Sequence, residues 1–152
     1  MSDYYIKIIP TDPYCRVPET VAETVRAYLE DCMVAMSAEV VVHEAPAFVD
    51  CGGYLQKISC PFCGSDLFAE GWWTDAMNAA SDSKELFAEL EEQELPCCGR
   101  RASLNDLQYD YPCGFACTEF ALLYPRERPR QEHIKELERM LGMQIRVIYA
   151  RY

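Results

Sequence analysis

Two cysteine pairs carry the most specific chemistry in this sequence. Cys60 and Cys63 lie in a Cys-Pro-Phe-Cys-Gly stretch, and Cys97 and Cys98 lie in a Pro-Cys-Cys-Gly stretch. In such turns a proline sets one φ angle and a glycine accepts a positive one, so thiolates and backbone amides converge. Four thiolates around a tetrahedral ion form a common structural zinc site. We therefore expect these four cysteines to bind one structural Zn²⁺.

The second pair is less regular than the first. A standard second knuckle has a cysteine where this chain has Leu95, so Cys97 and Cys98 must both turn toward one ion. If one of them does not, the remaining candidates for the fourth ligand are Cys51, Cys113, Cys117 and His43. Arg100 and Arg101 follow the pair after Gly99, and we expect these cations to donate to sulfur and offset its negative charge. An ion with four protein ligands has no open position, so it stabilises the fold and does not catalyse.

The net charge of −11 belongs to the first two thirds of the 152-residue chain. Residues 1–59 hold 4 basic and 9 acidic side chains, residues 60–101 hold 3 and 9, and residues 102–152 hold 7 and 7. Such an acidic field repels phosphate backbones and speeds encounters with basic partners. Acidic surfaces also keep cytosolic proteins in solution, which is the simpler explanation of the charge.

The sequence favours a cytoplasmic protein without a membrane span. Apolar runs such as residues 120–124 are far shorter than the ~18–20 residues of a membrane helix. The first residues, Met1 to Tyr4, lack the basic and apolar regions of a signal peptide. Since the cytosol keeps thiols reduced, the nine cysteines favour a metal site over a disulfide framework.

Both ends of the chain have a strand, helix, strand pattern. Strands are expected over residues 4–9, 39–43, 114–124 and 143–149, and helices over residues 18–36 and 129–141. Two such halves form the ferredoxin-like βαββαβ arrangement, an antiparallel sheet with both helices on one face. We therefore expect an α+β frame of residues 1–53 plus 113–152.

Residues 54–112 are too long for a plain loop, so we expect an inserted zinc-ribbon-like module with helices. One helix is expected over residues 72–77, where Trp72 and Trp73 supply core to the small module. A second is expected over residues 83–94, with Leu86, Phe87 and Leu90 on its apolar side.

Two sets of residues in the insert are candidates for partner binding. The glutamates are expected on the solvated face of the second helix, as a docking surface for a basic partner: Glu85, Glu89, Glu91, Glu92 and Glu94. Asp106, Tyr109, Asp110 and Tyr111 mix carboxylates with aromatic rings in a loop. They are either turn and packing residues or a recognition patch of rigid rings beside charges.

An ordered set of short motifs carries a family resemblance. The motifs are Cys60-Pro61-x-Cys63-Gly64, Trp72-Trp73-x-x-Ala76-Met77, Pro96-Cys97-Cys98-Gly99, Ser103-Leu104-Asn105-Asp106-Leu107, Gly114-Phe115-Ala116 and Arg146-Val147-Ile148-x-x-x-Tyr152. The chain resembles, over nearly its whole length, a widespread family of uncharacterised bacterial zinc-ribbon-like proteins. The resemblance implies a bacterial origin and a metal, but no activity. A transporter-ATPase label given to some such proteins has no support here, because no glycine precedes a lysine as a phosphate-binding loop requires.

These observations lead to a non-enzymatic, zinc-stabilised, acidic interaction protein that binds a basic protein. A concrete form is an immunity or antitoxin-type protein that neutralises a basic bacterial toxin, since electrostatic steering suits such capture.

Two other classes of function remain open. One is a nucleic-acid-associated zinc-ribbon regulator that uses Arg126, Arg128 and Arg130, although the acidic charge disfavours nucleic acid. The other is a small hydrolase or redox enzyme that uses Cys113 and Cys117. No local motif places a cysteine beside His43 or His133, and we expect His133 to be exposed in the first turn of its helix.

Overall fold

The two ends of the chain meet in a four-stranded antiparallel sheet. The computed structural model describes residues 2–81 and 85–152. The strands are β1 (Tyr4–Pro10), β2 (Ser37–Val49), β7 (Gly114–Leu123) and β8 (Ile145–Arg151). Their order across the sheet is β2-β7-β1-β8, with Ile8 opposite Phe120 in β7 and opposite Val147 in β8. The strands expected at the two ends of the chain therefore pair in one sheet of a mixed α+β structure, with the first and last strands side by side.

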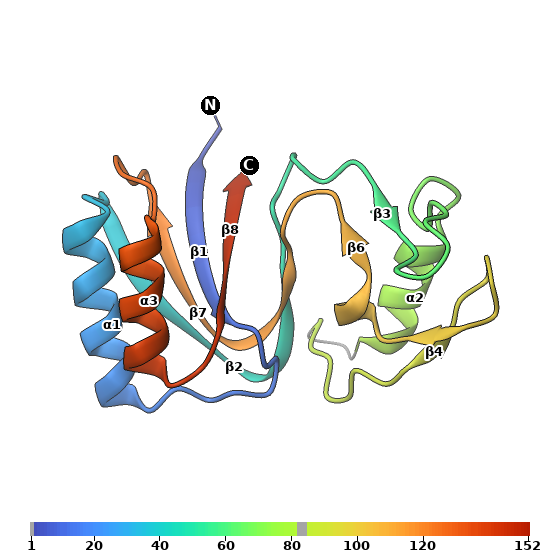
Figure 1. The fold of residues 1–152 in the computed structure, drawn as a ribbon, viewed down its shortest axis with the longest axis horizontal. Helices are drawn as coiled ribbons and strands as arrows, with labels where there is room; N and C mark the ends of the chain where they lie inside the picture. Colours follow the sequence, from blue (N-terminus) through green and yellow to red (C-terminus); the bar gives the residue numbers. More distant parts are fainter. Residues whose placement is uncertain (1, 82–84) are drawn as a thin grey trace.

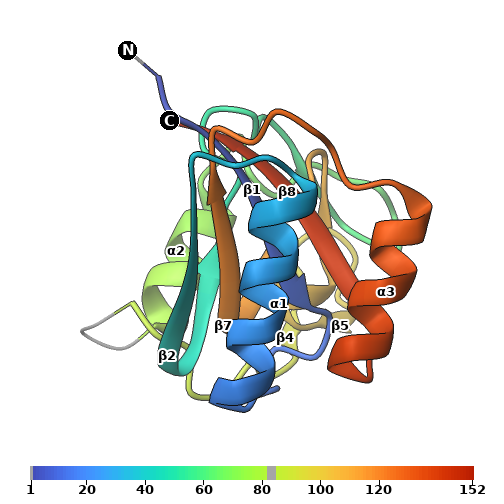
Figure 2. The same cartoon turned by 90° about the vertical axis from the view of Figure 1, so that its left-hand side faces the viewer.

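Two helices lie next to each other on one face of this sheet, α1 (Glu19–Cys32) and α3 (Gln131–Leu141) (Figure 1, Figure 2). Their apolar stripes and the sheet form one core that includes Val25, Leu29, Phe120 and Leu137. The α3 helix ends at Gly142, whose φ of 72° suits a residue without Cβ. No helix among the described residues combines the length and the apolar character that crossing a membrane requires.

The expectation that the first helix reaches Met36 is wrong. Helix α1 ends at Cys32, and Val34 takes a positive φ of 49° that turns the chain away. The backbone N–H of Met36 then donates to the carbonyl of Leu123 at 2.9 Å, so this residue already lies at the start of the sheet pairing. Its side chain is 75% exposed.

Strand β2 is longer than the expected residues 39–43 and carries the chain to the insert. Its pairing with β7 shifts register between Val42 and Ala47, around Pro46, which has no N–H to donate. Pairing then continues to Val49 opposite Gly114. The insert therefore leaves and rejoins the frame at two adjacent strand ends.

The described part of the insert, residues 54–81 and 85–112, contains a short helix and two small sheets. They are α2 (Trp72–Ala80), β3 (Ile58–Ser59) paired with β6 (Gln108–Tyr109), β4 (Gln93–Glu94) paired with β5 (Arg101–Ala102), and a 3-10 turn over Leu104–Asp106. Trp72 and Trp73 pack against its core, as expected. Phe115 of β7 belongs to the same core, with its ring centre 5.0 Å from that of Phe87. The insert therefore shares its core with the frame.

The expected helix over residues 83–94 is wrong for residues 85–94, and residues 83 and 84 lie outside the described residues. Leu86 forms a bridge to Ala47, and the N–H of Phe87 donates to the carbonyl of Pro46 at 2.7 Å. The N–H of Leu90 donates to the hydroxyl of Tyr14 at 2.8 Å. Because the frame takes these donors, they do not form the i to i−4 bonds of a helix.

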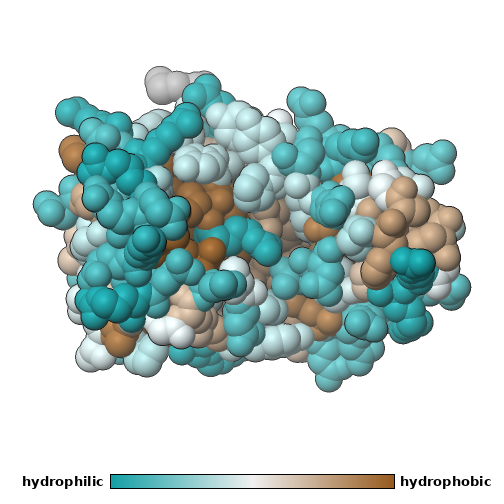
Figure 3. Space-filling view, viewed as in Figure 1, coloured by the Kyte–Doolittle hydropathy of each residue, from teal (hydrophilic) through white to brown (hydrophobic). Residues whose placement is uncertain are grey.

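Apolar and hydrophilic residues separate on the surface. Figure 3 shows mainly hydrophilic residues over the helices of the frame, and apolar residues toward the middle of the view, between those helices and the insert. Apolar residues are therefore visible on this face beside the helices of the frame.

Candidate metal centre and acidic groove

The four cysteines of the two knuckles meet at one point. The sulfurs of Cys60, Cys63, Cys97 and Cys98 all lie within 4.8 Å of one another. The sulfurs of Cys60 and Cys98 are 3.8 Å apart. A tetrahedral ion with metal–sulfur bonds of about 2.3 Å places its thiolates about 3.8 Å from one another. The cluster therefore has the spacing that one thiolate-bound metal ion requires.

The first knuckle is held by backbone hydrogen bonds. The N–H of Gly64 donates to the carbonyl of Cys60 at 3.0 Å, and Gly64 takes a φ of 75°. The N–H groups of Phe62 and Cys63 point at the Cys60 sulfur, at 3.3 and 3.4 Å. These donors favour a thiolate at Cys60, because a hydrogen bond to the charged form stabilises it.

The second knuckle is the turn between β4 and β5. The N–H of Leu95 donates to the carbonyl of Arg100 at 2.8 Å, and that of Gly99 donates to Leu95 at 2.9 Å. Leu95 itself is buried in the core of the insert. The position where a standard knuckle has its cysteine is thus a packing position here, and the adjacent pair after it reaches the cluster.

The thiols of the cluster differ in acidity. The Ser65 hydroxyl, 3.2 Å from the Cys63 sulfur, together with the Ser65 backbone, lowers the pKa of Cys63 to about 6. Loss of solvent and contacts with the other cluster thiols raise the pKa of Cys97 to about 12. A bound divalent cation would stabilise the thiolate form of these cysteines, because its positive charge offsets the repulsion between them.

The cations expected beside the sulfurs interact with other groups. The guanidinium of Arg100 lies 5.3 Å from the ring centre of Phe62, and Arg101 donates to the carbonyl of Glu92 at 2.7 Å. Sequence reasoning missed Ser65, which does contact a cluster sulfur. The signal for it was a hydroxyl residue directly after Cys63-Gly64 in a turn that folds back on itself.

The alternative ligands are held elsewhere. The sulfurs of Cys51 and Cys113 are 3.4 Å from each other, and His43 Nε2 lies 3.9 Å from the Glu119 carboxylate. Burial raises the pKa of both Cys113 and Cys117. Since the thiolate is the nucleophile, this does not favour an enzyme built on those two residues.

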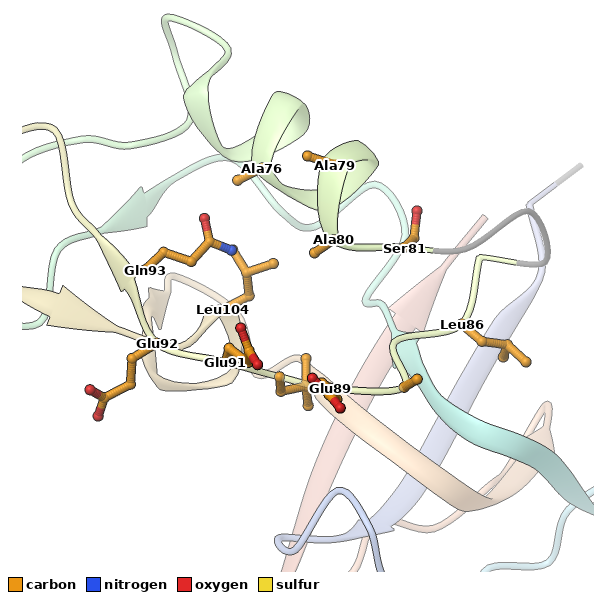
Figure 4. Close-up of a pocket in the computed structure, with 12 residues that line it drawn as sticks. Ala76, Ala79, Ala80, Ser81, Leu86, Glu89, Glu91, Glu92, Gln93 and Leu104 are labelled. Atoms are coloured by element: carbon orange, nitrogen blue, oxygen red, sulfur yellow. The ribbon is translucent and has the colours of Figure 1, made fainter.

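A groove lies beside α2, and we call it the acidic groove. It is lined by Ala76, Ala79, Ala80, Ser81, Leu86, Ala88, Glu89, Leu90, Glu91, Glu92, Gln93 and Leu104. Figure 4 shows the alanines on α2 across from the segment that carries the glutamates, with the side chain of Glu92 directed away from the helix. All three glutamates are exposed, so the groove combines a small-residue wall with carboxylates.

Two other predicted glutamates lie outside this lining. Glu85 and Glu94 are both exposed, and Glu94 belongs to β4 near the second knuckle. The glutamates are therefore solvated as expected, but they lie on a non-helical segment and not on the face of a helix.

The second expected patch is divided between interior and surface. Asp106 accepts from the Ser103 hydroxyl at 2.8 Å, and Asp110 accepts from the N–H of Gln56 at 3.2 Å. Tyr109 points into the insert, where burial raises its pKa. Tyr111 is 40% exposed and stacks on Tyr54 with ring centres 4.8 Å apart. Of the two aromatic candidates, Tyr111 is the one that a partner can reach.

The expectation that His133 is exposed is wrong. It is buried, and its Nδ1 accepts from the backbone N–H of Arg130 at 3.1 Å, capping the start of α3. Its ring also lies edge-on to Tyr28 of α1, with centres 6.4 Å apart. This imidazole joins the two helices of the frame.

Comparisons of the chain with protein-family models, with curated proteins and with solved structures find no match.

Proposed function

We propose that the protein is a non-enzymatic interaction protein that binds a basic segment of another protein in the acidic groove. The observation that supports this is the pairing of an alanine wall on α2 with the carboxylates of Glu89 and Glu91. Lysine and arginine side chains need both surfaces, because an aliphatic stem packs on apolar groups while the charged head binds carboxylates. The specific form we propose is neutralisation of a basic bacterial toxin in the cytoplasm.

We further propose that the cysteine cluster holds a structural Zn²⁺. The spacing of the sulfurs and the amides directed at Cys60 support this choice, and tetrahedral thiolate sites suit zinc. The cluster joins the first knuckle to the β4–β5 turn, and β4 continues from the segment that lines the groove. The ion would thus stiffen one wall of the groove.

We also propose that the frame has the ferredoxin-like fold. The strand order β2-β7-β1-β8 and the two adjacent helices support this, because the βαββαβ pattern places its first and third strands at the centre of the sheet. In that arrangement the insert replaces the connection between the second and third strands.

A nucleic-acid regulator has weaker support. The guanidinium of Arg128 lies 5.4 Å from the ring centre of Tyr149, and Arg130 pairs with Glu132 at 3.0 Å. Two of the three candidate arginines thus already have partners within the frame, which leaves less positive charge for phosphates.

The test compares two variants with the same net charge. The groove variant carries Glu89→Lys, Glu91→Lys and Glu92→Lys, and the control variant carries Glu19→Lys, Glu39→Lys and Glu127→Lys on exposed positions of the frame. The probe is an immobilised nona-arginine peptide, and the association rate is measured at low and high salt. We expect the groove variant to associate about tenfold more slowly than the control, because charge acts mainly on encounter.

Equal rates for the two variants would show that net charge alone drives the binding and would overturn the groove proposal. A DNA duplex forms the second arm of the test. Tighter binding of the DNA than of the peptide by the unchanged protein would favour the regulator instead.

A further inference from the structure

Two buried cysteines face each other where the insert meets the frame. Cys51 follows β2 and Cys113 precedes β7, so residues 54–112 all lie between them. Cys51 is 0% exposed and Cys113 is 2% exposed, and their sulfurs are 3.4 Å apart. Neither belongs to the four-cysteine cluster.

We infer that Cys51 and Cys113 form a site of reversible oxidation, at which a hydroperoxide converts the two thiols into a disulfide that closes the root of the insert. The sulfurs need to approach by little more than 1 Å, since a disulfide bond is about 2.05 Å long. The cross-link would join the two chain segments that carry the insert.

Contacts with β8 hold both cysteines in place for this reaction. The carbonyl of Cys51 accepts from the N–H of Arg151 at 3.3 Å, and the carbonyl of Cys113 accepts from Arg146 Nη1 at 2.6 Å. Both partners belong to the same strand. Because one rigid element fixes both backbones, little freedom is lost when the sulfurs join.

The hydrogen bond between the sulfurs assigns the order of steps. The thiol of Cys113 donates to the sulfur of Cys51, so negative charge is better tolerated at Cys51. The Cys51 thiolate attacks the hydroperoxide, the O–O bond breaks, and Cys51 becomes a sulfenic acid. The Cys113 sulfur then attacks the Cys51 sulfur and displaces hydroxide. With hydrogen peroxide, two thiols and one peroxide yield one disulfide and two waters.

The reaction is expected to be slow in the closed protein. Burial raises the pKa of both thiols, and the thiolate is the reactive form. Oxidation therefore depends on opening at the root of the insert, and the disulfide then opposes further opening. By closing a loop around the whole insert, it restricts the unfolded chain and raises the melting temperature.

The experiment uses the full chain, purified in the presence of zinc. The protein is treated with excess hydrogen peroxide, free thiols are alkylated, and trypsin with a glutamate-specific protease cuts the chain. Peptide 45–57 then carries Cys51 as its single cysteine, separated from Cys32. We expect it to be linked to the peptide that carries Cys113 and Cys117, with fragmentation placing the bond at Cys113. Dithiothreitol should separate the two peptides and reverse a rise in melting temperature.

Four variants check the assignment. Cys51→Ala and Cys113→Ala should lose the linked peptide and the rise in melting temperature, whereas Cys32→Ser and Cys117→Ser should keep both. Fragmentation of the unchanged protein gives the answer even if the alanine variants do not fold. A bond from Cys51 to any other cysteine, or no linked peptide after prolonged oxidation, would overturn the inference.

Discussion

The indole nitrogen of Trp73 lies 3.2 Å from the hydroxyl oxygen of Tyr109, and that hydroxyl donates to the carbonyl of Leu104 at 2.7 Å. One phenol thereby links α2, β6 and the 3-10 turn of the insert. The ring is also 5.9 Å from Phe48 of β2, so the same residue touches the frame. Tyr109 is thus a packing residue with both of its hydrogen-bonding functions used.

Tyr109→Phe should destabilise the protein. The change keeps the ring but removes the partner of the Trp73 N–H and of the Leu104 carbonyl, and unpaired buried polar groups cost about 1–3 kcal/mol. Urea unfolding measures the loss. Tyr111→Phe is the control and should change little, because that ring is exposed. The reverse ranking of the two variants would contradict the packing role.

Metal binding is expected to depend on the first knuckle. Cys60→Ser with Cys63→Ser should remove close to one zinc per chain, and the insert should melt at a much lower temperature. The reason is that structural zinc contributes an apparent ~10–16 kcal/mol, comparable with the stability of a whole domain. Metal analysis and calorimetry are the measurements. The control is the double variant that carries Cys15→Ser and Cys32→Ser. Unchanged zinc content would remove the metal from the proposal.

Phe115→Ala should weaken the attachment of the insert. Phe115 is 1% exposed, and its ring centre lies 5.2 Å from that of Phe48 and 5.0 Å from that of Phe87. Removal of the ring therefore leaves a cavity between frame and insert. Such substitutions cost about 3–5 kcal/mol. Unfolding followed separately by the tryptophans of the insert and by sheet circular dichroism is expected to split into two transitions. A single transition at unchanged stability would argue against a shared core.

Deleting the insert tests the independence of the frame. We expect residues 1–53 joined to 113–152 by a short flexible linker to keep a folded sheet, because its helices cover one face. The competing expectation is that Phe48 and Phe115 need the insert as cover. Circular dichroism distinguishes them, since a wholly disordered variant would support the competing view.

Glu119→Gln should change how stability depends on pH. Burial raises the pKa of Glu119, assisted by Asp50 and opposed by Lys7 and His43. The folded state therefore holds the proton more tightly than the unfolded state. The contribution of Glu119 to the free energy of unfolding is therefore greatest below the ordinary glutamate pKa. It falls as the pH rises from that pKa to the higher pKa of the folded state.

The glutamine variant should lack this fall. Urea unfolding between about pH 4 and about pH 6 should show a gain in stability relative to the unchanged protein that grows with pH. Glu39→Gln, at an exposed position, is the control and should give no such trend. A gain that shrinks as pH rises would mean that the contacts of Glu119 with Lys7 and His43 outweigh its burial.

Local sequence patterns predicted the parts of the structure that depend on local rules. The spacing of Cys60 and Cys63 and the turn around Cys97 and Cys98 anticipated one cluster, because each knuckle is closed by its own backbone. Runs of β-forming residues anticipated the four strands of the frame, although β2 extends further than expected. These features need no knowledge of distant contacts.

The wrong predictions concern segments whose conformation is set by residues far away in the sequence. Leu86, Phe87 and Leu90 fit a helical period, yet Phe87 bonds to Pro46 and Leu90 to Tyr14, far away in sequence. Tyr109 fitted both a packing residue and a surface anchor, because nothing nearby in the sequence revealed the indole of Trp73. The acidic groove likewise depends on small residues of α2 facing a separate segment.

The last register pair of β2 and β7, Val49 opposite Gly114, has a kinetic consequence. These two residues can pair only when the chain between them forms a closed loop. The entropic cost of closing a loop grows with its length. A collapsed insert brings its own ends together and acts as a shorter tether. The refolding rate of the sheet should therefore be governed by how fast the insert collapses.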